Sequence, residues 1–370
     1  MIKEDKRQFF KILLSPIGLP TKSIGSWTNR IQRFQEKTGY FDSIISPTPS
    51  PDQLHVFAEK RQPGKLLKLI LRNNLQAFRY RKFLDAVLSF GSLSQPLQIL
   101  VMDDKNLLEA LVSIKLNLPK HSEIIFSFHG HRLLLGPYLA DRVDKVLFLT
   151  KRGYLETFEA NHQHPPLSFV VGNGVRSDLF FPISRSEKHK QREALGFSVD
   201  NPIIIWMANS RPVKGFHLFK KVIAVLLKKY PNLQVLSIGH EPDESISYPN
   251  WHQLGKVPNE KLPKYLQIGD FYFFTSLWQE GFGLSLAEAV KCGNFALASN
   301  AGGIPDVVSG CPLAELVMEP NSISCWVDTF DKLLTKKSSN TISDEEMRDW
   351  LSNWHDYQAW ERKYLHALES

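Results

Sequence analysis

Cysteine and long apolar runs are both scarce in this chain of 370 residues. Cys292, Cys311 and Cys325 form an odd, sparse set without metal-ligand spacing, which fits a reducing cytosol better than a disulfide framework. No apolar run approaches the roughly 18 residues that span a bilayer. Residues 1–7 are charged and lack the apolar stretch of a secretory signal. We therefore expect a cytoplasmic protein.

Acidic clusters are also missing. The pair Asp103–Asp104 stands alone in the sequence, and we interpret it as part of a solvated loop. The sequence therefore predicts no metal site and no cofactor, and it indicates no nucleic-acid partner.

The net charge of +7 is unevenly distributed. Residues 1–183 contain 25 Lys and Arg against 16 Asp and Glu, a net charge of +9, whereas residues 184–370 contain 20 against 22, a net charge of −2. A basic half beside a nearly neutral one predicts an acidic partner for the first half, either an anionic membrane surface or an anionic acceptor.

Short apolar runs alternate with helix-like stretches, which is typical of parallel sheets covered on both faces. The length predicts two domains, each with its own core. We therefore expect an α/β protein with two doubly wound, Rossmann-like domains that bind ligands beyond the carboxyl ends of their strands. The expected strands are 11–14, 97–102, 124–128, 145–149, 168–171, 203–207, 234–238, 271–274 and 295–298.

The polar stretch 181–188, which contains one proline, marks the expected boundary between these domains. We assign 1–183 to the first domain, 184–342 to the second and 343–370 to a C-terminal helical segment. Aromatic residues of this last segment are spaced by three and four, which predicts a stripe on one face of a helix that packs on a core. They are Trp350, Trp354, Tyr357, Trp360 and Tyr364.

Two glutamates eight positions apart, Glu280 and Glu288, flank the transition from an expected strand to an expected helix. Glycines at this turn let the backbone approach a ligand closely, and the free N–H groups of the new helix form an anion site. Carboxylates accept hydrogen bonds from sugar hydroxyls, and amides at a helix start donate to phosphate. A ligand with a sugar on each side of a phosphate group would use all of these parts, which predicts a nucleotide-diphosphate sugar.

With these features in view, the chain resembles family 4 of the retaining glycosyltransferases over nearly its whole length, most densely from about residue 200 to 310. The resemblance implies the GT-B fold, in which two Rossmann-like domains face a central cleft and a C-terminal helix crosses back to the first, acceptor-side domain. It rests on four segments that stand in family order. They are Val171–Pro182, Ser276–Gly283, Glu288–Gly293 and Asn300–Val308.

The resemblance implies a role for each matching residue. Glu280 would bind hydroxyls of the transferred sugar, and Glu288 would hold the ribose hydroxyls. The alternatives are a solvated loop carboxylate for Glu280 and an exposed helix residue for Glu288. The backbone between them would line the donor pocket at Gly281, Phe282, Gly283, Leu284 and Ser285.

The leaving diphosphate needs positive charge, which the family supplies from the loop after the first strand of the second domain. Lys214 matches this pattern directly. The family's arginine stands five positions before the lysine, where this chain has Asn209. Arg211 is therefore the candidate for the same phosphate, from a shortened turn, and Asn209 remains a candidate donor contact.

The remaining candidates flank the donor site. The family often has a histidine after the strand at 124–128, which makes His129 a candidate catalytic residue, because histidine donates or accepts near neutral pH. His131 competes for this assignment, and a structural histidine is the alternative. Gly25 is a candidate in the place of the family's glycine-rich loop, and Val257 resembles a residue whose backbone contacts the base.

These matches imply a hexosyl- or related glycosyltransferase that retains the anomeric configuration, with a UDP-sugar as the favoured donor and a glycan or lipid-linked acceptor. The pathway expected is surface polysaccharide or glycolipid assembly. No carboxylate nucleophile stands in the matched motifs, so front-face attack is the preferred mechanism. Two alternatives stay open: a non-catalytic sugar-nucleotide-binding subunit of a partner transferase, and a GT-B epimerase or phosphorylase.

Residues 65–90 predict a basic amphipathic helix. Its basic residues fall within about a third of the helical circle, and helices with such a basic face can lie on anionic membranes. The alternative is an ordinary helix of the outer layer with a solvated face. The residues on the basic face are Lys65, Lys68, Arg72, Arg79 and Lys82, and Leu67, Ile70 and Leu71 lie outside it. The expected location is thus cytoplasmic, with peripheral contact at the inner face of the membrane as a hypothesis.

Overall fold

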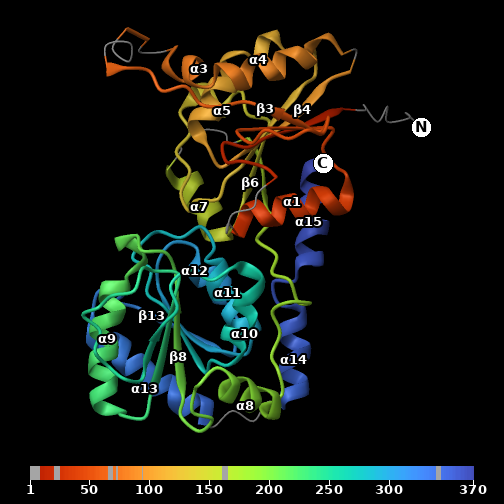
Figure 1. Ribbon diagram of the computed structural model, residues 1–370. Helices are drawn as coiled ribbons and strands as arrows, with labels where there is room; N and C mark the ends of the chain where they lie inside the picture. Colours follow the sequence, from red (N-terminus) through yellow and green to blue (C-terminus); the bar gives the residue numbers. More distant parts are fainter. Residues whose placement is uncertain are drawn as a thin grey trace. The chain divides into compact units, whose positions relative to one another are not determined.

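The computed structural model divides the chain into two compact units (Figure 1). Unit 1 comprises Met1–Leu149, Gly153–Val171 and Tyr364–Ser370, and unit 2 comprises Thr150–Arg152 and Gly172–Lys363. The residues that the structure describes are 9–20, 26–65, 70–71, 74–93, 95–160, 166–338 and 343–370.

Unit 1 is built on a sheet of seven strands in the order β3-β2-β1-β4-β5-β6-β7, and every neighbouring pair is parallel. The central strands β1, β4 and β5 are mostly apolar and mostly buried, because helices cover both faces of a parallel sheet. The strands are β1 Phe10–Leu14, β2 Ser43–Ser46, β3 His55–Phe57, β4 Leu97–Met102, β5 Glu123–Ser127, β6 Lys145–Phe148 and β7 Leu167–Val170.

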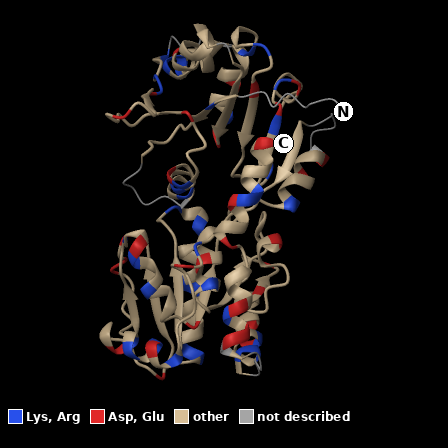
Figure 2. Cartoon of the chain, turned by 90° about the vertical axis from the view of Figure 1, so that its right-hand side faces the viewer, with Lys and Arg blue, Asp and Glu red and all other residues tan. Residues whose placement is uncertain are grey.

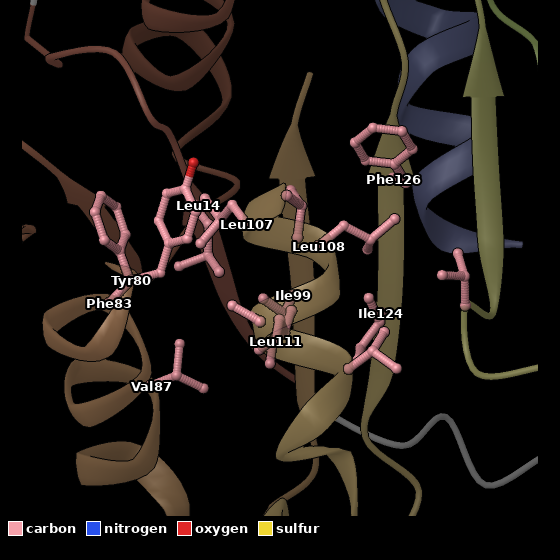
Figure 3. Packing of buried hydrophobic residues seen from close by; sticks show 14 of the residues in the cluster. Leu14, Tyr80, Phe83, Val87, Ile99, Leu107, Leu108, Leu111, Ile124 and Phe126 are labelled. Atoms are coloured by element: carbon pink, nitrogen blue, oxygen red, sulfur yellow. The ribbon is translucent and has the colours of Figure 1, made fainter. Parts of the chain in front are cut away.

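The core of unit 1 lies between this sheet and its helices. In Figure 3, Val87 of α4 and Leu108 of α5 point toward the same apolar layer as Ile99 and Phe126 of the sheet. The helices are α1 Ser26–Thr38, α3 Leu75–Arg79, α4 Arg81–Ser89, α5 Lys105–Ser113, α6 Pro137–Ala140 and α7 Lys151–Ala160, with 3-10 turns η2 Phe90–Ser92 and η3 Lys115–Asn117.

Unit 2 contains a sheet of six strands in the order β10-β9-β8-β11-β12-β13, again parallel throughout. Figure 1 shows α9 and α13 on one side of this sheet and α10 and α11 on the other. The strands are β8 Ile203–Met207, β9 Gln234–Ile238, β10 Trp251–Gln253, β11 Phe271–Phe274, β12 Phe295–Ser299 and β13 Ala314–Val317. The helices are α8 Arg185–Ala194, α9 Phe216–Lys229, α10 Leu262–Gln267, α11 Leu284–Lys291, α12 Ile304–Val308, α13 Ile323–Ser338, α14 Asp344–Asn353 and α15 Tyr357–Glu369, with η4 Pro212–Lys214 and η5 Asn259–Lys261.

A buried ion cluster fixes the amino-terminal edge of this second sheet. Asp270 accepts hydrogen bonds from the Ile203 backbone N–H at 2.9 Å and from Lys337 at 2.7 Å. Lys188 and Arg192 complete the cluster at 3.0 and 2.5 Å. Burial opposes the charge on Asp270, but the three cations outweigh it and hold its pKa well below the usual range. Helices α8 and α13 are thereby tied to the edge opposite the one where ligands bind in such sheets.

The predicted α/β class with two doubly wound parallel sheets is confirmed, and the last seven residues, 364–370, return to unit 1. All nine expected strands form, with ends that shift by at most one residue. Four further strands escape the sequence pattern. They are β2, β3, β10 and β13, which are short and, except for β2, only partly buried.

The single basic helix predicted for residues 65–90 is wrong in its described part. The helix α3 ends at Arg79, α4 begins at Arg81, and Tyr80 between them is fully buried. Burying this large ring turns the chain and breaks the predicted periodicity. Lys68, Arg72 and Leu67 lie outside the described residues. Figure 2 shows basic and acidic segments interspersed in both units, rather than separated by sign.

The C-terminal segment also departs from one continuous helix. The helix α14 ends at Asn353, α15 begins at Tyr357, and Trp354 lies between them. Ser343 starts α14 with a capping box, in which its side chain and that of Glu346 bond each other's backbone N–H groups. The aromatic residues Tyr357, Trp360 and Tyr364 of α15 are buried, as expected of a helix that packs on a core.

Candidate active site

Two loops meet at the carboxyl edge of the unit 2 sheet. One follows β8 and leads into α9, and the other follows β11 and leads into α11. Because β8 and β11 are neighbouring parallel strands, their following loops emerge side by side. These loops contain most of the residues that the sequence singles out.

Lys214 and Glu280 form an ion pair between these loops. The Lys214 Nζ lies 2.6 Å from Glu280 Oε1, and the two side chains are only 20% and 12% exposed. Ser276 Oγ donates to the same carboxylate oxygen at 2.5 Å. The Lys214 cation and a carboxylate that can accept hydrogen bonds from sugar hydroxyls are therefore held together. The place is partly shielded from water, which strengthens electrostatic interactions. The sequence did not predict that Ser276 contacts Glu280. The one feature that could have indicated it is the position of Ser276, four residues before Glu280.

The Lys214 loop is fixed by the end of β11. Leu277 N–H donates to Val213 O at 2.8 Å, and Thr275 Oγ1 donates to Gly215 O at 3.1 Å. Gly215 has φ +75°, and a Cβ there would lie 1.9 Å from Thr275 O. Only glycine permits this approach, so the loop that positions Lys214 depends on it.

We expect Gly215→Ala to lower the free energy of unfolding by about 2 kcal/mol, because it adds both a clash and an unfavourable backbone conformation. Chemical denaturation measures this change. Gly196→Ala is the matched control, because Gly196 has φ +78° but open space around its Cβ position. Equal losses in the two variants would contradict the role of the close approach at Gly215.

Asn209 and Arg211 stand on the same loop. Asn209 Oδ1 accepts the Arg211 backbone N–H at 3.1 Å, so the asparagine shapes the turn that replaces the family's arginine position. Both residues are exposed.

The turn between Glu280 and α11 is held by the segment before α12. Gly303 N–H donates to Glu280 O and Gly302 N–H donates to Gln279 Oε1, both at 2.7 Å. Gly283 stands at the N-cap of α11 with φ +82°. Gly281 and Phe282 of this turn are buried, and Leu284 and Ser285, which begin α11, are partly buried. The first N–H groups of a helix have no carbonyl partner within it, so this turn offers donors to an anion.

Glu288 lies on α11, and burial raises the pKa of its carboxyl group to about 8. In the described part of the structure no hydrogen bond or neighbouring charge compensates this burial. The exposed helix residue offered as the alternative is therefore wrong. Glu288 is only partly buried, and a carboxyl group to which no described residue donates a hydrogen bond has its acceptor atoms free for a ligand.

Two further donor-side residues have recognisable places. Ser285 hydrogen-bonds with the buried Tyr272 hydroxyl, next to the carboxyl edge of β11. Val257 is partly buried and follows Gly255, whose carbonyl accepts the Gly239 N–H at 2.6 Å. The segment before Val257 is thus pinned to the loop after β9.

In unit 1, His129 follows β5 at the carboxyl edge of the first sheet. Its Nε2 lies 3.1 Å from Ser127 Oγ, and its ring meets that of Trp27 edge-on at 5.3 Å. Burial, with a smaller effect of Arg30, lowers the pKa of His129 to about 3. The ring is therefore neutral near pH 7 and acts as a hydrogen-bonding group, without a charge.

We expect the ring NMR signals of His129 to stay unshifted between pH 5 and 8, because a pKa of about 3 keeps the ring neutral in this range. In the unfolded chain a histidine is protonated below about pH 6.5. The folded protein therefore loses stability as the pH falls below that value. His129→Gln assigns the signals, and a titration of His129 near pH 6–7 would contradict its burial.

The other candidate residues of unit 1 have different environments from that of His129. His131 is buried, and its Nε2 lies 2.9 Å from Glu156 Oε2, a structural contact within unit 1. Asp103 is exposed in the turn after β4, as the expected solvated loop requires, and its Oδ1 accepts the His129 N–H at 2.8 Å, while Asp104 is partly buried and caps α5. Gly25 lies outside the described residues.

Comparison with known proteins bears on this arrangement. Residues 187–350 match the family described as glycosyl transferases group 1, and both glutamates and Lys214 fall inside the match. The match lies within unit 2. Among similar curated proteins, the chain is 25% identical over 224 residues to the phosphatidylinositol N-acetylglucosaminyltransferase GPI3 subunit of Saccharomyces cerevisiae, covering 58% of this chain and 48% of that protein.

A second protein similar to this chain is the GDP-mannose-dependent monoacylated alpha-(1-6)-phosphatidylinositol monomannoside mannosyltransferase of Corynebacterium glutamicum. It is 25% identical over 236 residues, 58% of this chain and 61% of that protein. The chain thus spans about half to three fifths of the length of these two relatives.

The likeness in fold to solved structures covers both units. Sucrose-phosphate synthase from Thermosynechococcus elongatus aligns over 97% of this chain and 98% of that chain, with a TM-score of 0.72 and 14% identity. HepE of Anabaena, solved with UDP and glucose, aligns over 98% and 100%, with a TM-score of 0.68 and 16% identity. The chain has the GT-B fold.

Within the ranges that the structure describes, no three His, Cys, Asp or Glu side chains gather as a possible metal site. No helix in those ranges combines the length and apolar character needed to cross a bilayer.

Proposed function

We propose that the chain transfers a sugar from a nucleotide-diphosphate sugar, with a UDP-sugar favoured, to an acceptor hydroxyl with retention of configuration. The observation that supports it best is the Lys214–Glu280 pair, set beside the N-terminus of the helix that contains the partly buried Glu288. A cation, a set of backbone donors and two carboxyl groups are the parts that a sugar, a diphosphate and a ribose require.

The proposed chemistry is electrostatic. Lys214 and the first N–H groups of α11 stabilise negative charge on the departing diphosphate, with Arg211 reaching the same phosphate. Glu280 accepts hydroxyls of the transferred sugar, and Glu288 accepts those of the ribose. The acceptor hydroxyl attacks from the face that the diphosphate leaves, and the departing phosphate oxygen takes its proton. Neutral His129 contributes a hydrogen bond to the donor sugar.

The acceptor is proposed to be a glycan or a lipid-linked hydroxyl, in surface polysaccharide or glycolipid assembly. The names of the yeast and Corynebacterium relatives both contain phosphatidylinositol, which supports a lipid-linked acceptor.

A thermal-shift panel of UDP-, GDP- and ADP-sugars, followed by donor hydrolysis assays, tests the proposal. We expect one nucleotide class to raise the melting temperature and its sugar to be released slowly to water. If no member of the panel is bound or cleaved, the proposed enzyme function is wrong.

A second candidate is a non-catalytic subunit that binds the sugar nucleotide and activates a partner transferase. The replacement of the family's arginine by Asn209 favours it, as does the yeast relative, whose name describes a subunit. Binding without turnover over broad acceptor panels would support this function. Conversion of the donor's sugar into its epimer would instead support the epimerase alternative, and cleavage of a glycosidic bond by phosphate would support the phosphorylase alternative.

Contact of unit 1 with an anionic membrane belongs to the same proposal. Ile70 is 69% exposed and Phe57 46% exposed, and the Lys82 Nζ lies 5.7 Å from the Phe57 ring centroid. The positive charge available to a membrane is reduced, because Lys82 pairs with Glu59 at 2.6 Å and Arg79 is partly buried. Flotation with anionic and with neutral vesicles tests it, and binding that does not weaken with salt or with Arg81→Glu would contradict an electrostatic contact.

A further inference from the structure

The corner between α14 and α15, residues 354–356, contains a histidine in an unfavourable conformation. His355 has φ +47°, a value that residues other than glycine rarely adopt. Its carbonyl accepts the Val175 N–H at 2.8 Å, and the Tyr357 N–H donates to Val175 O at 3.1 Å. The surrounding backbone therefore holds the corner in this conformation from both sides, as happens where a side chain must be aimed.

The His355 ring contacts the donor loop. It meets the Phe282 ring edge-on, with centroids 5.0 Å apart, and packs against Trp354 on its own corner at 4.4 Å. Its Nε2 lies 2.9 Å from Val307 O on α12. Because a carbonyl only accepts, Nε2 donates the hydrogen, which fixes one tautomer and the plane of the ring.

These two contacts reach both sides of the turn that contains Glu280. Phe282 belongs to the turn itself, and α12 follows Gly303, whose N–H holds the Glu280 carbonyl. The histidine thus connects the turn and the helix that supports it through one rigid ring.

Lys291 ties the other end of α11 to the same corner. Its side chain is only 1% exposed, and its Nζ donates to Leu351 O at 2.6 Å and to Trp354 O at 2.7 Å. It thereby satisfies carbonyls at the end of α14, where no intrahelical N–H remains. Helix α11, which contains Glu288, is held to the corner at its C-terminus while His355 contacts the turn at its N-terminus.

We propose that His355 is a positioning residue for the donor loop. It acts through its contacts with Phe282 and the end of α12, and Lys291 supports it by holding the C-terminal end of α11. The inference rests on the proposed function, because it assigns the loop to the donor sugar. It identifies a site-determining residue in a segment far from the loop in sequence, and it predicts that changing the corner alters donor-sugar binding.

Hydrogen exchange tests the physical part without any ligand. His355→Asn removes the ring but keeps a residue that tolerates positive φ. We expect amide exchange in residues 281–286 to rise about tenfold, while exchange in the β8 and β11 strands stays unchanged. His366→Asn, at an exposed histidine of α15, is the control. Unchanged exchange at 281–286 would overturn the proposal. His355→Gly replaces the asparagine variant if that one fails to fold.

Kinetics tests the functional part. We expect His355→Asn to raise KM for the nucleotide sugar about tenfold while kcat and the affinity for UDP change by less than about twofold. In a double-variant cycle, Phe282→Leu and His355→Asn should be non-additive, because they remove one contact. Additive effects, or equal losses for UDP and its sugar, would overturn the positioning role. A wild-type protein that binds no nucleotide sugar would instead overturn the proposed function, and the exchange experiment would still decide the inference.

Discussion

Glu288→Gln is expected to stabilise the free protein and to weaken nucleotide binding at the same time. Burial raises the pKa of Glu288 to about 8, above its ordinary value of 4.5. Between these values the unfolded chain is ionised and the folded one is protonated, so the wild-type protein loses stability as the pH rises from 4.5 to 8. At about 1.36 kcal/mol per pKa unit, the variant should be more stable at pH 8 by roughly 4 kcal/mol and no different at pH 4.

The same replacement leaves only one acceptor oxygen for two ribose hydroxyls. We expect nucleotide affinity to fall about 10- to 100-fold, the range for lost hydrogen bonds to a charged group. Wild-type affinity should also increase from pH 6 to 8 as the carboxyl group ionises, a dependence that the variant lacks. Denaturation and thermal shift across pH measure both effects, with the exposed Glu193→Gln of α8 as control. A variant that keeps full nucleotide-dependent stabilisation would show that Glu288 does not hold the ribose.

Lys214→Met is expected to lower kcat by about 10²- to 10³-fold, the usual loss when one electrostatic group of a transition state is removed. The reason is twofold: the departing diphosphate loses its cation, and Glu280 loses the partner that lies 2.6 Å away. Steady-state kinetics with the donor identified by the panel measures this loss.

Lys229→Met is the matched control, because Lys229 makes an ion pair of similar length with Asp331 at the surface of the same unit. We expect it to leave kcat within about twofold of the wild type, since exposed pairs contribute little. Wild-type turnover in Lys214→Met would exclude this lysine from the chemistry. Lys214→Arg should recover part of the activity, because it restores the charge with a different shape.

The sheets were predictable because their central strands are continuous apolar runs. The strand β8, Ile-Ile-Ile-Trp-Met, is buried at every position. Such a continuous apolar run fits a strand covered on both faces, whereas a surface helix alternates apolar and polar residues. The strand β13 is mostly half-buried and contains Glu315, so its pattern resembles that of a loop. Strands at a sheet edge lack a neighbour on one side, and their sequences are accordingly less constrained.

The candidate site was predictable in its residues and not in its contacts. Lys214 and Glu280 are each marked by their own motif, but their pairing depends on two loops held together by Gly215 and Thr275. The environment of Glu288 depends on what covers α11, which a helical pattern does not specify. His355 escaped notice because the aromatic spacing predicted one helix through it, and its positive φ has no sequence signal comparable to glycine.

The return of residues 364–370 to unit 1 has a consequence for how the protein is made. Gln98 of the central strand β4 donates to Leu368 O at 2.8 Å, so the first sheet uses a partner from a segment that follows unit 2 in the chain. On the ribosome, unit 2 has nearly all of its residues available before unit 1 does. Unit 1 is therefore begun before unit 2 but completed after it, and Gln98 lacks its Leu368 partner until residues 364–370 have been added.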